Sequence, residues 1–152
     1  MNRIETIRTI IAQHPEAAFI FCNGLTSREV AHVADRPGNF YQIHGMGETL
    51  AVGIGLKMAR PDLEVIVVDG DGNAVMGLSA LTLLPIEGLT YYVLVNNSYE
   101  TTGSQAVPPL NFDHPAMIKI AINPGKLAAP NPPLPETIRD NFMNWLAKDN
   151  NV

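Results

Sequence analysis

Two short apolar runs in this chain end in polar residues that could bind a metal ion. The runs 65–68 and 91–95 are followed by Asp69-Gly70-Asp71-Gly72-Asn73 and by Asn96-Asn97. Both runs are too short for helices and are bounded by turn residues, so we expect strands. If these strands are parallel neighbours, Asp71 and Asn97 emerge at the same carboxyl edge of the sheet, where open α/β sheets bind ligands.

The oxygen atoms of these side chains suit a hard divalent cation. Magnesium prefers octahedral oxygen coordination at about 2.0–2.1 Å and shares its ligand shell with phosphates. Gly70 and Gly72 allow a sharp turn and a close approach of the backbone to a ligand. A helix expected over 73–84 would direct its free amides and the positive end of its dipole at a phosphate. The turn therefore predicts an anchor for magnesium and a diphosphate.

These glycine-rich turns have other interpretations. A helix–loop–helix calcium loop beginning at Asp69 needs glycine at its sixth position and glutamate at its twelfth, where this chain has Ala74 and Ala80. A dinucleotide fingerprint beginning at Gly45 has Leu50 in place of its third glycine, which is a poor match. A plain acidic turn without a metal is the remaining alternative for Asp71.

The acidic turn and the asparagine pair together resemble the cofactor-binding motif of thiamine diphosphate enzymes. The resemblance implies that the side chains of Asp71 and Asn97 and the carbonyl of Tyr99 bind Mg²⁺. It also implies that thiamine diphosphate is the cofactor. Contacts to it are expected from Gly70, Gly72, Asn73, Asn97 and Tyr99.

His44-Gly45-Met46-Gly47 acquires a role within the same resemblance. In these enzymes a large apolar residue in such a turn wedges between the two rings of the cofactor and bends it. Met46 matches that residue, and the carbonyl of His44 would accept a hydrogen bond from the amino group of the pyrimidine. Met46 and His44 are therefore candidate catalytic residues, and 44–46 are candidate cofactor contacts. Ordinary core filling is the alternative for Met46, because methionine suits that role.

Hydroxyl and amide side chains crowd the stretch that follows the asparagine pair. Thr101, Thr102, Ser104 and Gln105 surround Gly103. Loops at a sheet edge commonly carry binding groups, so Thr101 is a candidate cofactor contact and Thr102 a candidate catalytic residue. A solvated connector is the alternative.

Strands and helices alternate along the chain, which predicts an α/β fold with a doubly wound parallel sheet flanked by helices. Helices are expected over 2–14, from a cap at Thr26 or Ser27 to about 34, and over 48–60, 73–84 and 136–149. Strands are expected over 17–22, 40–43, 65–68, 91–95 and 118–122. The stretch 124–135 holds five prolines and should be extended.

Size and composition limit the class of protein. A chain of 152 residues is expected to form one domain with a substantial core. A net charge of −5 and the lack of a Lys/Arg stripe argue against a nucleic-acid partner. The single cysteine, Cys22, excludes an internal disulfide framework and fits a reducing compartment. Neither a signal peptide nor a membrane helix is expected, so the cytoplasm is the expected location.

Further segments extend the resemblance to the sulfopyruvate and phosphonopyruvate decarboxylase family, specifically to its cofactor-binding subunit or domain. These segments are 23–24, 26–29, 36–41, 45–47, 70–72, 96–97, 102–105, 123–125 and 132–136. The resemblance implies decarboxylation of a small anionic 2-oxo acid, with the cofactor as electron sink. It leaves open whether the head group is a sulfonate or a phosphonate.

The resemblance also implies a partner. Enzymes of this type activate the cofactor with a glutamate from a separate, pyrimidine-binding domain. We therefore expect the chain to be inactive alone and to work in a hetero-oligomer with at least two copies of each subunit, the alpha subunit supplying that glutamate. A non-catalytic thiamine diphosphate-binding module is the alternative from another functional class.

Overall fold

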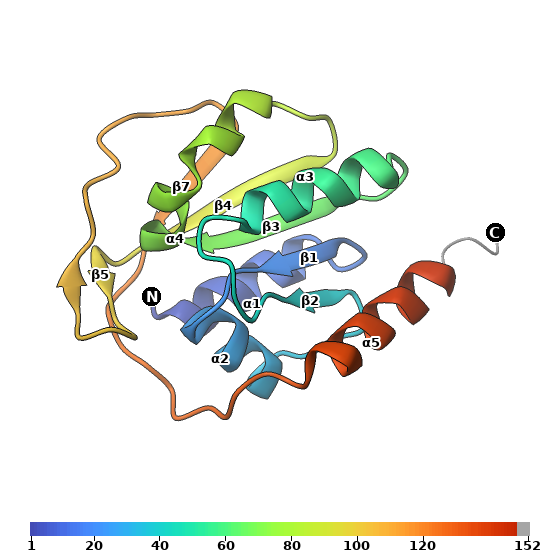
Figure 1. Ribbon diagram of the computed structural model, residues 1–152, viewed down its shortest axis with the longest axis horizontal. Helices are drawn as coiled ribbons and strands as arrows, with labels where there is room; N and C mark the ends of the chain where they lie inside the picture. The colour runs from blue at the N-terminus through green and yellow to red at the C-terminus, as the bar shows by residue number, and fades with distance from the viewer. Residues whose placement is uncertain (149–152) are drawn as a thin grey trace.

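Five parallel strands form the central sheet of the computed structural model, which describes residues 1–148 (Figure 1). Their order is β2-β1-β3-β4-β7. The bounds are Ala18–Phe21 (β1), Asn39–Tyr41 (β2), Val65–Gly70 (β3), Leu89–Val95 (β4) and Met117–Ala121 (β7). The chain passes from β1 to β2 on one side and then to β3 on the other, so the winding direction reverses between β1 and β3. This arrangement confirms the doubly wound parallel sheet that the sequence predicts.

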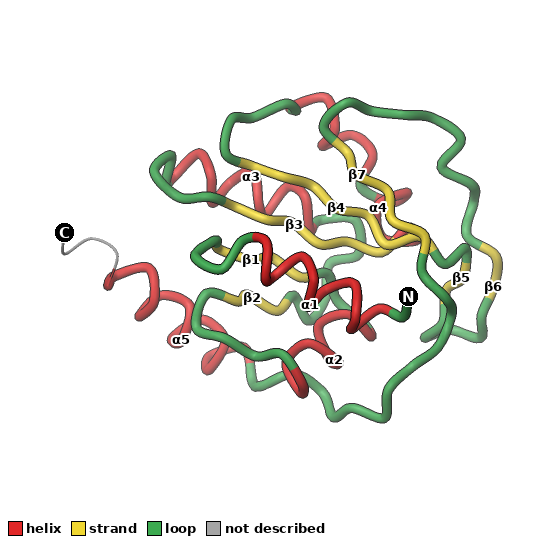
Figure 2. Tube along the Cα trace, turned by 180° about the vertical axis from the view of Figure 1, so that it is seen from behind, coloured by secondary structure: helices red, strands yellow, loops and turns green. Residues whose placement is uncertain are grey.

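Helices cover both faces of the sheet. α1 (Arg3–Gln13) and α2 (Leu25–Val33) lie on one face, and α3 (Thr49–Ala59), α4 (Asp71–Met76) and the 3-10 helix Leu78–Leu83 lie on the other. α5 (Pro135–Lys148) runs beside the edge strand β2 (Figures 1 and 2). In the described part of the chain, no helix is long and apolar enough to cross a membrane.

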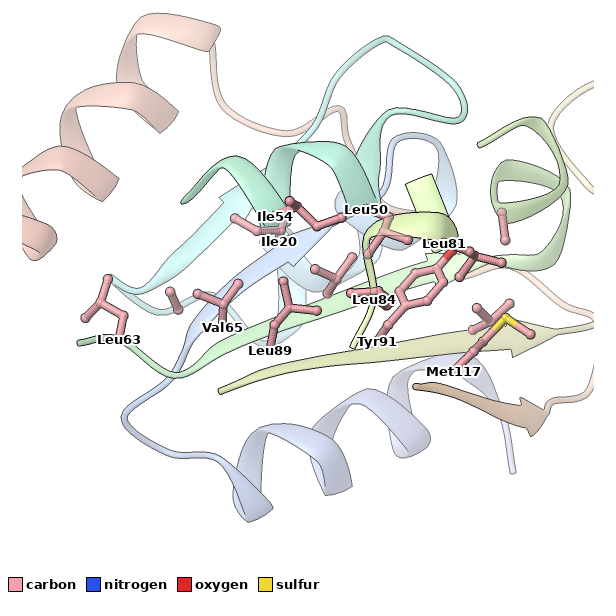
Figure 3. Close-up of a cluster of buried hydrophobic side chains, with 14 of the residues drawn as sticks. Ile20, Leu50, Ile54, Leu63, Val65, Leu81, Leu84, Leu89, Tyr91 and Met117 are labelled. Atoms are coloured by element: carbon pink, nitrogen blue, oxygen red, sulfur yellow. The ribbon is translucent and has the colours of Figure 1, made fainter. Parts of the chain in front are cut away.

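The apolar core is split by the sheet into two clusters. Val65 and Val67 of β3 belong to the cluster beneath α3, and Ile66 and Val68 belong to the cluster beneath α1 and α2, as alternation along a strand requires. Figure 3 shows the first cluster, in which Leu50 and Ile54 of α3 pack over Ile20 and Val65. A Cβ atom at Gly53 would lie 2.2 Å from Val67 Cγ2, so α3 lies very close to β3.

Two predictions about helices are wrong. The helix expected over 73–84 begins at Asp71 and is interrupted at Gly77, beyond which the chain forms a 3-10 helix. A Cβ atom at Gly77 would lie 2.1 Å from the carbonyl oxygen of Gly47, so this break marks a backbone contact between two turns. Neither Thr26 nor Ser27 caps α2: Gly24 precedes the helix, and the Ser27 hydroxyl donates to the carbonyl of Cys22 at 2.7 Å.

The C-terminal third of the chain follows the predictions with small shifts. The last strand lies at 117–121 instead of 118–122, and 123–134 is without helix or strand, as its prolines predict. The loop expected after Asn97 contains a short antiparallel ribbon of β5 (Ser98–Tyr99) and β6 (Gln105–Ala106) that the sequence did not predict. The predicted end of the last helix, Asp149, lies outside the described residues.

Candidate functional site

A cavity of about 100 Å³ lies at the carboxyl ends of β1, β3 and β4, where the winding direction reverses. Open α/β sheets bind ligands at this kind of position. Figure 1 shows α4 and β5 beyond the carboxyl ends of β3 and β4, at the same end of the sheet. Of the residues singled out in the sequence, the cavity wall includes Met46, Gly70, Asp71, Gly72, Asn73, Tyr99 and Thr101.

Asp71 joins the end of β3 to the turn after β4. Its carboxylate is buried and accepts three backbone hydrogen bonds: from Gly72 N to Oδ1 at 2.9 Å, and from Asn96 N and Asn97 N to Oδ2 at 3.1 and 2.6 Å. The two segments therefore meet at the predicted edge. The contact is made by the backbone of Asn97, and the cavity wall does not include its side chain.

The two asparagines after β4 have different surroundings. The Asn96 amide donates to Glu100 Oε2 at 2.6 Å and its oxygen accepts from Ser98 N at 3.0 Å. Asn97 has a left-handed backbone with φ of 59°, which asparagine tolerates better than most residues. Its side chain makes no hydrogen bond to any residue among 1–148. The Asn97 amide is thus free for a ligand, whereas the Asn96 amide is not.

Tyr99 contributes its ring to the wall of the cavity and its carbonyl to a turn. The carbonyl oxygen accepts from Thr102 N at 3.1 Å and from Ser104 N at 3.0 Å, which uses both of its lone pairs. A Cβ atom at Gly72 would lie 2.4 Å from the ring, so a side chain at this position would require the Tyr99 ring to move. A metal ion at this carbonyl oxygen would compete with these hydrogen bonds.

Asp69, the first acid of the turn, is buried inside the sheet layer. Its Oδ1 accepts from Gly70 N at 3.0 Å and from Asn73 Nδ2 at 2.6 Å, and its Oδ2 accepts from the Tyr91 hydroxyl at 3.0 Å. Burial raises the pKa of Asp69 to about 6, and the hydrogen bonds from Asn73 and Tyr91 oppose the rise. Asp69 is therefore a structural acid, and the sequence did not identify it as one.

The Asn73 side chain links Asp69 to the turn that carries Met46. Its Oδ1 accepts from Gly47 N at 2.6 Å, and its Nδ2 donates to Thr49 Oγ1 at 2.6 Å as well as to Asp69. Both N–H donors of the side chain are thus used within the chain. Any contact of Asn73 with a diphosphate would come from its backbone.

A second amide holds the other end of the same turn. Gln42 Nε2 donates to the carbonyl of Gly45 at 2.8 Å, and Thr49 Oγ1 donates to Gln42 Oε1 at 2.9 Å. Buried side chains therefore hold the backbone of both glycines that flank Met46: Gln42 holds Gly45, and Asn73 holds Gly47. Met46 itself lines the cavity and is 45% exposed, so it is not ordinary core filling.

Two predicted catalytic residues lie outside this cavity. His44 is exposed and lines a neighbouring cavity, which Thr101 also borders. Thr102 is exposed, and its hydroxyl donates to Gln105 Oε1 at 2.9 Å. The structure thus separates the threonines: Thr101 faces both cavities and Thr102 stabilises the ribbon of β5 and β6.

An ion cluster that the sequence did not predict borders the cavity. Arg3, at the start of α1, forms ion pairs with Glu29 of α2 and with Glu100 of the turn after β4. Arg3 and Glu100 are 97 positions apart, so no local pattern connects them. Glu100 also accepts from Gly125 N at 2.6 Å. The cluster connects the turn that follows Asn97 to α1 and α2, the helices on one face of the sheet.

The donor atoms fit a divalent cation that takes few ligands from protein. Within 1–148, no group of three or more His, Cys, Asp or Glu side chains could hold a metal, so a metal here would rely on the Asp71 carboxylate and neutral oxygens. Asp71 forms no ion pair with a described Lys or Arg. A carboxylate has about four acceptor positions, so one remains after three hydrogen bonds. Mg²⁺, which keeps several ligands from water and phosphate, matches this set.

Comparisons with known proteins point to a family. Residues 22–129 match the family described as thiamine pyrophosphate enzyme, C-terminal TPP binding domain. Sulfopyruvate decarboxylase subunit beta from Methanocaldococcus jannaschii is 37% identical over 108 residues, which are 68% of this chain and 57% of that subunit. Phosphonopyruvate decarboxylase from Streptomyces hygroscopicus is 34% identical over 120 residues, 76% of this chain and 30% of that enzyme.

A solved structure is also similar. The 2-oxoglutarate:ferredoxin oxidoreductase from Magnetococcus marinus is 29% identical, with a TM-score of 0.47, and the match covers 61% of this chain and 32% of that chain. The chain therefore spans less than two thirds of the length of each of these three proteins.

Proposed function

Because the chain belongs to the thiamine pyrophosphate enzymes, through their C-terminal cofactor-binding domain, we propose that it is the cofactor-binding subunit of a two-subunit decarboxylase. The proposed reaction converts 3-sulfopyruvate to sulfoacetaldehyde and carbon dioxide in the cytoplasm. The observation that carries this proposal is the carboxylate of Asp71, which joins the ends of β3 and β4 beside a cavity at the switch point of the sheet. Similarity to sulfopyruvate decarboxylase beta subunits supports the substrate.

In this proposal the acidic turn holds the diphosphate end of the cofactor. Asp71, the Asn97 amide and the Tyr99 carbonyl would bind Mg²⁺, and the backbone of 70–73 would contact the diphosphate. When bound, thiamine diphosphate supplies a carbon nucleophile and an electron sink for the loss of carbon dioxide. The Asp71 carboxylate is already fixed by three backbone amides, so little ordering is needed when the metal binds.

Met46 would support the bent form of the cofactor. Its side chain reaches the cavity, and the amides of Gln42 and Asn73 fix the glycines on either side of it. The carbonyl of His44 would accept a hydrogen bond from the pyrimidine amino group. A wedge of this kind works by position, so the buried hydrogen bonds beneath the turn are part of its function.

A partner subunit completes the proposed site. The relatives from Methanocaldococcus jannaschii and Methanothermobacter thermautotrophicus are named as beta subunits. Met46 is 45% exposed although it borders the cavity, and in this proposal that exposed side is where another protein surface would meet the cofactor. That surface would supply the activating glutamate, in an assembly with at least two copies of each chain.

Phosphonopyruvate is the second candidate substrate, because phosphonopyruvate decarboxylase is 34% identical to this chain. The test is purification of the chain with and without the product of a neighbouring reading frame. Each preparation is assayed with thiamine diphosphate and Mg²⁺ on 3-sulfopyruvate, phosphonopyruvate and pyruvate. We expect turnover only by the assembled pair and a preference for 3-sulfopyruvate. Turnover by this chain alone would contradict the need for a partner, and cofactor binding without turnover by the pair would favour a non-catalytic module.

A further inference from the structure

A second cavity, of about 570 Å³, opens beside the first and shares Asn23, Gly24 and Thr101 with it. Its remaining walls come from α2, from the residues before Met46 and from the segment 131–135. Figures 1 and 2 show the connection from β7 to α5 passing near α2, and its residues 131–135 line the cavity. The larger cavity thus adjoins the first one, and the shared residues lie between them.

The charge of the second cavity is positive. Arg28 is the one formally charged residue among the described residues that line it, and no carboxylate does. Arg28 forms no ion pair with any described residue, whereas Arg3, Arg60 and Arg139 each form at least one. A guanidinium that is partly withdrawn from water without a counter-ion favours the binding of an anion.

A nearby carboxylate is already committed elsewhere. Glu100 and Arg28 line a third cavity together. Glu100 Oε2 pairs with Arg3 and accepts from the Asn96 amide, and Oε1 accepts from Gly125 N. Arg28 is held in place by donation from Nη2 to the carbonyl of Ala129 at 3.0 Å. The guanidinium is therefore positioned by a neutral group and not neutralised.

Neutral donors gather around the same cavity. The side chains of Asn23, Thr101 and Asn131 line it and make no hydrogen bond to any residue in the described range. Thr101 and Asn131 are exposed, so water now satisfies their polar groups, which remain available to a ligand. A positive residue with a few polar side chains in a concave site is a composition that suits a small anion.

We propose that this cavity binds the tetrahedral anionic head group of the substrate, a sulfonate or a phosphonate, with Arg28 as its charge partner. The inference rests on the proposed function and extends it to substrate selection. In 3-sulfopyruvate and in phosphonopyruvate one methylene separates the head group from the ketone carbon. The head-group site must therefore adjoin the cofactor cavity, as the shared residues Asn23, Gly24 and Thr101 make this one do.

The first experiment measures binding and needs no turnover. Sulfoacetate, phosphonoacetate and acetate are titrated by calorimetry into the assembled protein, as wild type and as the variants Arg28→Gln and Arg8→Gln. Arg8 is the matched control, because it is exposed and away from the cavity. We expect sulfoacetate or phosphonoacetate to bind wild type and Arg8→Gln equally, and Arg28→Gln at least about tenfold more weakly, as for a lost charge-assisted hydrogen bond. The tighter of the two ligands identifies the head group.

Equal affinity of wild type and Arg28→Gln for sulfoacetate and phosphonoacetate would overturn the site. Wild type that binds acetate as tightly as these two anions would overturn it as well.

The second experiment measures selectivity, as the ratio of kcat/KM for 3-sulfopyruvate to kcat/KM for pyruvate. Arg28→Gln should lower this ratio at least about tenfold, and Arg28→Lys should recover part of it because the charge is kept. An unchanged ratio would also overturn the proposal. Arg28-dependent binding of sulfoacetate without turnover on any 2-oxo acid would instead contradict the proposed reaction and leave the anion site standing.

Discussion

The two sides of the candidate site differ in how far the chain satisfies its own polar groups. On the β3 side, Asp69, Asp71 and Asn73 use their side chains in hydrogen bonds to other parts of the chain. The other side is the wall between the two cavities, near the start of α2. There the side chains of Asn23 and Thr101 make no hydrogen bond within the described residues. The first side is built before any ligand arrives, and the second offers groups that a ligand must complete.

This difference assigns different work to the two sides. Fully satisfied buried networks make a structure rigid, and a rigid turn can hold a cofactor in one position through many turnovers. Donors without a protein partner cost little free energy while water can bind them, and they can donate to a substrate that replaces that water. Substitutions on the two sides should therefore change different measurements.

The largest effect is expected for Asp71→Ala, which removes the carboxylate that fixes the turn after β4. Two backbone amides, of Asn96 and Asn97, lose their acceptor, and the proposed metal loses its charged ligand. We expect Mg²⁺-dependent binding of thiamine diphosphate to weaken by more than about 100-fold, since hydrogen bonds to charged groups contribute about 1.5–3 kcal/mol each. Calorimetry measures this, and far-UV circular dichroism checks that the fold is kept. Unchanged affinity would contradict the role of Asp71.

A pair of matched substitutions tests the comparison directly. Thr49→Val removes a fully buried hydroxyl that accepts from Asn73 and donates to Gln42, and it should lower the free energy of unfolding by about 1–3 kcal/mol. Thr101→Val removes a hydroxyl without a described partner, so its effect should stay within about 0.5 kcal/mol. Urea unfolding measures both. Equal losses from the two variants would show that the two sides do not differ as described.

The buried acid Asp69 should make stability depend on pH in a defined window. Burial raises its pKa from 3.8 to about 6, so between these values the unfolded chain ionises at this position while the folded chain keeps the proton. The free energy of unfolding should therefore fall as pH rises through this window, by at most about 1.4 kcal/mol per pH unit, and level off above it. Asp69→Asn, which cannot ionise, should lose this slope. Urea midpoints of both proteins measured from low to neutral pH give the comparison, and parallel curves would contradict it.

The smallest effect on binding is expected for Met46→Ala. The side chain is half exposed and contributes little to the core, and the glycines around it are held by Gln42 and Asn73 independently of it. If Met46 acts as a wedge, kcat of the assembled enzyme should fall about tenfold or more while cofactor affinity changes less, because the lost interaction favours the reactive shape of the cofactor. Met46→Leu, which keeps the volume, is the control. A larger loss in affinity than in kcat would contradict the wedge.

Local sequence patterns were sufficient for most of the fold. The β-branched run at 65–68 and the apolar run at 91–95 gave strands within two residues of those observed, because a strand buried on both faces needs an unbroken apolar sequence. The interruption of the helix at Gly77 could not be read locally. It arises from a contact with Gly47, which is far away in the sequence.

The site was predictable only where topology decides the geometry. Parallel neighbouring strands bring Asp71 and Asn97 together, and this required no knowledge of side-chain contacts. The sequence could not show that Asn73 is used as a structural link or that Arg3 reaches Glu100, because each depends on which groups lie nearby in three dimensions. The choice of Asn97 over Asn96 came from the family resemblance, because the two residues are of the same type and only their partners in the structure separate them.

The contact between Gly47 and Gly77 has a consequence for how this protein can vary. A Cβ atom at 77 would overlap the Gly47 carbonyl, and one at 47 would lie 2.8 Å from the carbonyl carbon of Met76. A side chain at either position therefore requires the other turn to move. A library that samples these two positions should therefore recover glycine at both. Larger residues become accessible only through coordinated changes in the segments on each side of the contact.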